Sequence, residues 1–175
     1  GTSYPRLAYI RGGGNRAEVD VAEELKDVTT ERIVGYMGSV PQIPQLGDYH
    51  NLKHYAPVIS ERLKHVLESF NLKKVQFLPT LIREEKGNRH DGYYILHVYN
   101  EIKSLDREKS VWENSGFDKK RIMVNKLVLD NIAIDNIPLE ERLIFINWED
   151  STHLLFHRSV VEKVLEIAPK GLTVY

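Results

Sequence analysis

The chain has 175 residues, contains no cysteine and carries 24 basic and 25 acidic side chains. A chain this long folds as one domain and buries roughly 70% of its unfolded surface without a disulfide or metal, and the lack of cysteine removes thiolate ligands and a cysteine nucleophile. The balanced charge gives no field for nucleic acid, and no apolar run is long enough to span a membrane. We therefore expect one soluble, cytoplasmic domain over residues 1–175 with no nucleic-acid or membrane partner.

The N-terminal third has the weakest pattern. Residues 7–10 predict a short strand that ends at the glycines of positions 12–14, and residues 15–27 fit a strand or a helix equally well. No signal peptide is expected, because no basic segment is followed by an apolar stretch. Residues 35–56 predict a long loop, which is usually functional or else contains an unrecognised element.

Two amphipathic helices are predicted, at Ser60–Phe70 and Ser159–Ala168, each capped by its serine. The first has an apolar stripe at helical spacing, formed by Leu63, Val66, Leu67 and Phe70. We expect both stripes to be buried, with Leu67 and Leu165 in the core. A shift of about 98 residues aligns Leu67 with Leu165, as an old duplication would, although any two amphipathic helices look alike in this way.

The remaining elements are strands. Residues 75–82 predict a strand with an edge or a bend at Pro79, and Tyr93–Tyr99 predicts a central strand because both of its faces are largely apolar. Four further strands are predicted, at residues 122–129, 143–148, 153–157 and 172–175. The fold class is therefore α+β, with a mostly antiparallel or mixed sheet and helices packed largely on one face.

Histidines are the residues that could carry chemistry. The spacing of His153 and His157 places both on one side of a strand or helix, and His50 and His54 lie in the long loop. Either pair could centre the site of a small hydrolase or transferase. However, a zinc site needs three or four ligands and the HExxH pattern is absent, so no metal, cofactor or catalytic residue is predicted.

Two clusters of aromatic and charged residues are candidates for binding a partner protein. The polar stretch 105–120 contains Trp112, Phe117, Glu108 and Glu113, and the long loop contains Tyr49 and Tyr55. Aromatic side chains among charges are common anchors of protein interfaces. The alternative is that each aromatic ring anchors its own loop to the core.

The order of segments in the second half is distinctive. Gly92–Asn100 reads GYYILHVYN, Leu105–Ser110 reads LDREKS and Lys126–Asp130 reads KLVLD. This order resembles a family of bacterial immunity proteins from polymorphic toxin systems, formerly a domain of unknown function typified by a Myxococcus protein. The similarity covers residues 58–175 well and residues 1–57 loosely.

Members of that family are often encoded beside secreted toxins, including type VI secretion effectors. The resemblance therefore implies a protein that binds and neutralises a cognate toxin without catalysis and without a cofactor. A domain that senses a ligand or acts as a scaffold is the alternative from another class.

Overall fold

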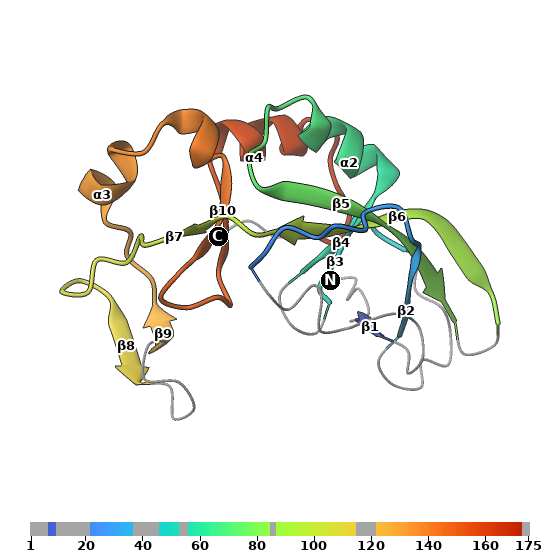
Figure 1. The fold of residues 1–175 in the computed structure, drawn as a ribbon, viewed down its shortest axis with the longest axis horizontal. Helices are drawn as coiled ribbons and strands as arrows, with labels where there is room; N and C mark the ends of the chain where they lie inside the picture. Colours follow the sequence, from blue (N-terminus) through green and yellow to red (C-terminus); the bar gives the residue numbers. More distant parts are fainter. Residues whose placement is uncertain are drawn as a thin grey trace.

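A six-stranded sheet forms the larger part of the protein (Figure 1). The computed structural model describes residues 7–9, 22–36, 46–52, 56–84, 87–114 and 122–172. In sheet order the strands are β1 (Leu7–Tyr9), β2 (Arg32–Tyr36), β5 (Val75–Arg83), β6 (Arg89–Val98), β4 (Val58–Ser60) and β3 (Tyr49–His50). Only the β2–β5 pair is parallel, so this sheet is mixed.

Two smaller sheets extend the structure on one side. The first has the order β11 (Leu154–Phe156), β10 (Ile144–Asn147) and β7 (Glu101–Ile102), with β10 parallel to β7. The second is the hairpin of β8 (Val111–Asn114) and β9 (Ile122–Lys126). The mixed and antiparallel pairing confirms the predicted α+β class.

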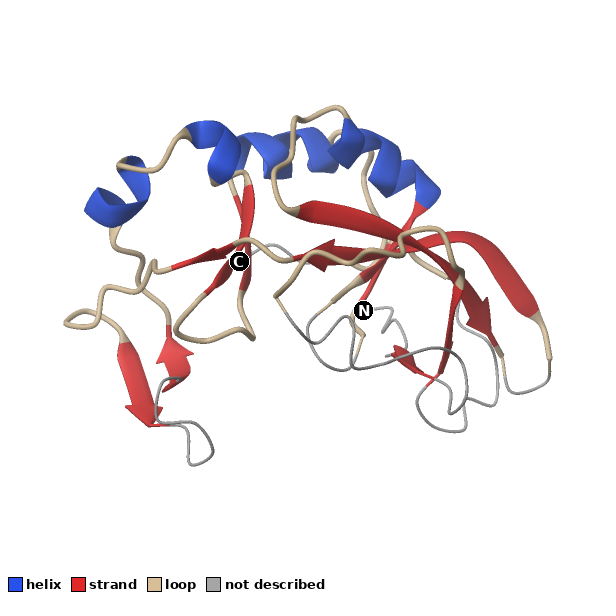
Figure 2. Cartoon of the chain, in the orientation of Figure 1, coloured by secondary structure: helices blue, strands red, loops and turns tan. Residues whose placement is uncertain are grey.

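The helices lie along one side of the sheets (Figures 1 and 2), as predicted. They are α2 (Glu61–Glu68), α3 (Asn131–Asp135), α4 (Arg158–Leu165) and the short 3-10 helix η1 (Leu139–Glu141). None of these helices, within the residues that the structure describes, is long and apolar enough to cross a membrane. The main core joins α2 and α4 to strands of both larger sheets, through Ile59, Leu63, Leu67, Leu96, Ile144, Val160 and Val164.

The prediction for the last helix was wrong about its buried face and its cap. Leu165 is 51% exposed, whereas Val160 and Val164 are 0% and 4% exposed. Successive residues of a helix point about 100° apart, so the face that buries Val164 turns Leu165 toward solvent. The helix begins at Arg158, and its cap is His157, whose Nδ1 accepts the Ser159 N–H at 3.2 Å.

Strand β5 lies between β2 and β6, but among the described residues its Val75–Pro79 half pairs with β6 alone, so the predicted edge at Pro79 is local to that half. Pairing with β2 starts at Thr80, so Pro79 pairs only with Tyr94 of β6, and a missing N–H is tolerated there. The predicted bend is present as a shift in the pairing register between Thr80 and Ile82. The central position predicted for the tyrosine-rich strand, β6, is confirmed.

Several elements were not predicted. Strand β2 and helix α3 were missed, and the stretch expected to be a loop contains the end of β2 and all of β3. The strand at residues 7–10 is confirmed as β1. The glycines at 12–14, residues 15–21 and residues 173–175 of the expected last strand lie outside the described part of the chain, and Leu172 is not in a strand.

Candidate functional site

The β8–β9 hairpin projects from one end of the molecule, with β8 as its outer strand (Figure 1). Its register pairs Trp112 with Val124, Glu113 with Met123 and Asn114 with Ile122. Side chains alternate between the two faces of such a pair, so Ile122 and Val124 face inward and are buried, and Met123 faces outward. The hairpin therefore presents one face to its own small core and the other to solvent.

Trp112 lies on the inner face and is partly buried. Its ring packs against the cluster of Leu105, Ile122 and Val124, and its Nε1–H donates to the Arg107 carbonyl at 3.1 Å. The Arg107 guanidinium lies 5.2 Å from the centre of the ring, within the range of a cation–π contact. The side chain thus fixes the preceding turn to the hairpin and leaves part of its surface exposed.

The turn at Leu105–Ser110 is held by its own polar groups. The Asp106 carboxylate accepts the N–H of Glu108 and of Lys109, both at 3.1 Å, and the Lys109 ammonium at 2.6 Å. These bonds, led by the one from the Lys109 side chain, lower the pKa of Asp106. Glu108 is exposed on this turn. The charged run therefore has an architectural role in addition to any role in binding.

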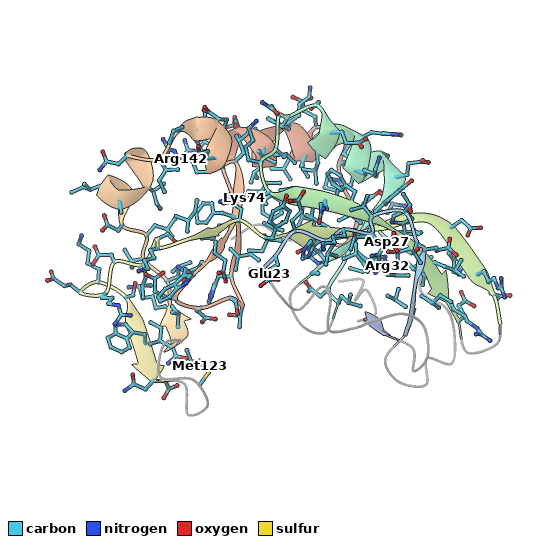
Figure 3. All side chains as sticks on the ribbon, viewed as in Figure 1. Glu23, Asp27, Arg32, Lys74, Met123 and Arg142 are labelled. Atoms are coloured by element: carbon cyan, nitrogen blue, oxygen red, sulfur yellow. The ribbon has the colours of Figure 1, made fainter. Side chains whose placement is uncertain are left out.

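The outer face of the hairpin is apolar and acidic. Val111 and Met123 are 54% and 52% exposed, so together they give this face an apolar surface. Figure 3 shows Met123 on the hairpin, apart from the six-stranded sheet. Glu113 is also exposed, and its Oε1 accepts a long hydrogen bond of 3.4 Å from Asn125.

A buried polar cluster at the base of the hairpin joins it to β10. The cluster consists of Ser104, Asn147, Glu149 and Asp150, each at most 6% exposed. Asn147 Nδ2 donates to Ser104 Oγ at 2.9 Å, and the Ser104 N–H donates to Glu149 Oε2 at 3.3 Å. Buried polar groups that are mutually satisfied fix a single arrangement.

The same cluster forms hydrogen bonds with β9. The Val124 N–H donates to Asp150 Oδ2 at 2.8 Å, and the Ile122 N–H donates to the Glu149 carbonyl at 3.0 Å. Burial alone raises the pKa of Asp150, but hydrogen bonds from Thr152 and Val124 outweigh it, so the pKa is lowered. Sequence reasoning missed this cluster, although the run Asn147–Asp150, polar at three of four positions and starting at the last residue of an apolar strand, was a usable signal.

The second aromatic cluster is placed differently. Tyr49 is partly buried on β3, and desolvation raises its pKa to about 12. His50, beside it, is 1% exposed. Tyr55 and His54 lie outside the described residues, as does Phe117 of the hairpin connection. The structure therefore places Tyr49 on a different element from Trp112, the candidate anchor of the hairpin.

The histidine pair has structural partners. His157 caps α4, while His153 Nδ1 lies 3.1 Å from Thr152 Oγ1 and 3.5 Å from an Asp150 oxygen. Across the part of the chain that the structure describes, no three His, Asp or Glu side chains are grouped as metal ligands would be. The geometry gives this pair roles in capping and in orienting a turn.

A cavity of about 530 Å³ lies among α2, α4, β6 and β11. Its walls are mainly apolar, and the polar side chains among them are Tyr49 and His153. The apolar side chains that line it are Ile59, Leu63, Leu67, Leu96, Leu127, Leu154, Leu155, Phe156, Val161, Val164 and Leu172. The size suits a small apolar ligand, but a reaction needs convergent acid, base or nucleophilic groups, which this lining does not bring together.

The comparisons with known proteins agree with the resemblance seen in the sequence. No curated protein matches the chain. The Imm11 immunity protein family matches residues 40–172, a range that includes the six-stranded sheet without β1 and β2, the whole three-stranded sheet, the whole described hairpin and the buried polar cluster at its base. Because this match covers most of the sequence, the chain belongs to the Imm11 immunity protein family.

Proposed function

We propose that this protein binds a cognate bacterial toxin directly and non-covalently, and so neutralises it in the cytoplasm of the cell that makes it. Membership of an immunity protein family is the observation that carries the proposal. The toxin would come from a polymorphic or type VI secretion system, encoded beside its immunity gene. Such a function requires a stable surface complementary to one partner, and it requires neither a cofactor nor a catalytic group.

We propose the β8–β9 hairpin as the docking surface, with Trp112 near its centre. Its base is fixed by the buried polar cluster, so little conformational entropy is lost on binding. Val111 and Met123 supply exposed apolar area, and Trp112 adds part of its ring. Glu108 and Glu113 lie at the rim of this surface, where charges set specificity and encounter rate.

The test is binding and neutralisation of the toxin encoded by the neighbouring gene. The toxin is expressed with and without this protein, growth is followed, and affinity is measured by calorimetry with an inactivated toxin. Wild-type protein should restore growth and bind at about nanomolar to micromolar Kd. A wild-type protein that neither binds nor protects would overturn the proposed function.

Matched variants test the docking surface. The double variant Val111→Lys with Met123→Lys should bind toxin at least about tenfold more weakly, because it places two charges where apolar area is buried. Its melting temperature should be unchanged, since both side chains are exposed. Ile132→Lys on α3, where Ile132 is 80% exposed, is the control and should bind normally.

Trp112→Ala is a second probe of the surface. It removes the ring that contacts Leu105, Ile122 and Val124, so its stability must be measured together with its affinity. If it keeps its melting temperature and still neutralises the toxin fully, and the double variant also binds normally, the docking surface lies elsewhere on the protein.

A further inference from the structure

The two edges of the β8–β9 hairpin differ. On β9, the N–H groups of Ile122 and Val124 point away from β8 and are occupied by Glu149 and Asp150. In an antiparallel pair, opposite residues alternate between hydrogen-bonded and non-hydrogen-bonded positions. Because Ile122 and Val124 bond away from β8, their partners Asn114 and Trp112 are also in non-hydrogen-bonded positions.

The free edge of the hairpin is therefore on β8. The backbone N–H and C=O groups of Trp112 and Asn114 point away from β9, toward the side facing away from the rest of the molecule (Figure 1). Within the described residues no turn, loop or side-chain hydrogen bond reaches these groups, whereas the same alternation puts the N–H and C=O of Glu113 in hydrogen-bonded positions opposite Met123. Alternate free groups on an uncovered strand form a template for one more strand.

We propose that the toxin partner adds an extended segment to this edge of β8, pairing its backbone with Trp112 and Asn114. This inference rests on the proposed function and specifies how recognition occurs. Strand addition obtains affinity from backbone hydrogen bonds and specificity from side chains on either side of the new strand. Here one side offers the exposed part of Trp112, and the other offers Glu113 with Val111 and Met123.

The charges of the edge favour a foreign strand over a second copy of this chain. Two copies could pair antiparallel so that the N–H and C=O groups of Trp112 and Asn114 are all used. That register places Glu113 directly opposite the second copy's Glu113, and opposed like charges destabilise a sheet. Two four-residue strands also bury far less than the roughly 1,200–2,000 Å² of a stable interface. A longer toxin segment with Lys or Arg opposite Glu113 meets neither obstacle.

A proline substitution tests the backbone contact. Asn114→Pro removes an N–H that the hairpin itself does not use, at an exposed strand end where proline is tolerated. Asn114→Ala removes the side chain and keeps the N–H, so it is the matched control. We expect Asn114→Pro to weaken toxin binding about tenfold or more and Asn114→Ala to change it less than about threefold.

Amide hydrogen exchange of the wild-type protein gives a second readout that does not depend on a variant folding. In the free protein the amides of Trp112 and Asn114 should exchange fast and that of Glu113 slowly. With the inactivated toxin bound, the first two should become protected. Size-exclusion chromatography tests whether the free protein dimerises through the same edge. We expect no dimer of the wild-type protein that is lost in the Asn114→Pro variant.

The outcomes separate this inference from the proposed function. If the wild type binds the toxin but the amides of Trp112 and Asn114 are not protected from exchange, strand addition is overturned. The proposed function is then left intact. Equal weakening by Asn114→Pro and Asn114→Ala shows recognition of the side chain and also overturns it. A wild-type protein that does not bind the toxin overturns both.

Discussion

Ser60 and His157 occupy the same position in two equivalent helices. Ser60 Oγ accepts the Leu63 N–H at 3.2 Å at the start of α2, and His157 Nδ1 accepts the Ser159 N–H at 3.2 Å at the start of α4. Each cap directly follows or ends a short strand, β4 or β11, and the two helices contact each other. The shift that superposes the caps also superposes Leu63 on Val160.

The alignment suggested by the sequence was therefore one residue too long. It aligned Leu67 with Leu165, whereas the shift set by the two caps aligns buried Leu67 with buried Val164. The one-residue error accounts for the wrong prediction that Leu165 is in the core, because adjacent helix positions face different directions.

Core truncation distinguishes the two alignments. Leu67→Ala should lower the free energy of unfolding by about 2–5 kcal/mol, because Leu67 is 1% exposed and its removal leaves a hole. Leu165→Ala should cost less than about 1 kcal/mol, because half of that side chain is already in solvent. Urea denaturation followed by circular dichroism measures both, and equal losses would contradict the observed helix face.

The histidine cap of α4 is open to replacement. His157→Ser preserves an acceptor for the Ser159 N–H, and serine is a favoured capping residue, so stability should be kept or slightly raised. His157→Ala removes the acceptor and should cost about 0.5–2 kcal/mol. The comparison is made by thermal melting, and a histidine with a role other than capping would show equal losses in both variants.

Asp48 joins three distant segments of the chain. Its carboxylate accepts hydrogen bonds from Ser60 Oγ at 2.7 Å, from Arg62 Nη2 at 2.5 Å and from the Lys170 N–H at 2.8 Å. Asp48→Asn keeps the shape but removes the charge, so at pH 7 it should cost about 1–3 kcal/mol of unfolding free energy. Chemical denaturation at neutral pH measures that loss.

The difference between wild type and Asp48→Asn should depend on pH. Burial alone raises the pKa of Asp48, but bonds from Arg62, Lys170 and Ser60 outweigh it and lower the pKa below the ordinary value. The stabilisation is then fully present above the unfolded-state pKa of about 3.9 and disappears as the pH falls through the folded-state pKa. The gap in stability should shrink below about pH 4, and a gap that widens on acidification would contradict this arrangement.

The cavity beneath α4 allows a gain in stability. Val164 lines it, so Val164→Ile adds a methylene to empty space and should stabilise by up to about 1 kcal/mol. Val160, one turn earlier, is 0% exposed and does not line the cavity, so Val160→Ile should overpack and cost about 1–3 kcal/mol. Changes in melting temperature of the same sign for both variants, relative to wild type, would show that the side chain at position 164 cannot extend into the cavity.

The elements that could be predicted from the sequence are those whose own pattern of apolar residues is sufficient to identify them as a strand or a helix. Strand β6 has two apolar faces and α2 has a clear stripe, so both were found. Strand β2 was missed because its first residue is arginine. Arg32 is only 7% exposed, since its guanidinium donates to the carbonyls of Thr30 and Asp27 at 2.5 and 2.6 Å. That arrangement depends on the fold of a neighbouring turn.

The candidate site was half predictable for a similar reason. Trp112, Glu108 and Glu113 stand out as an aromatic residue among charges, and the structure places them on one hairpin and its preceding turn. The hairpin that carries Trp112 and Glu113 is joined to the rest of the protein by Ser104, Asn147, Glu149 and Asp150, which come from two segments over forty residues apart. No periodicity within either segment indicates that pairing.

The cover that Glu149 and Asp150 place over β9 has a consequence for aggregation. A hairpin with two bare edges can recruit a strand on each side, and repeated recruitment leads to an open-ended filament. In this hairpin the β9 edge is closed by Glu149 and Asp150 of its own chain. Because only the β8 edge is open, a single added strand would complete this sheet, and the described hairpin has no second bare edge through which copies of the chain could polymerise.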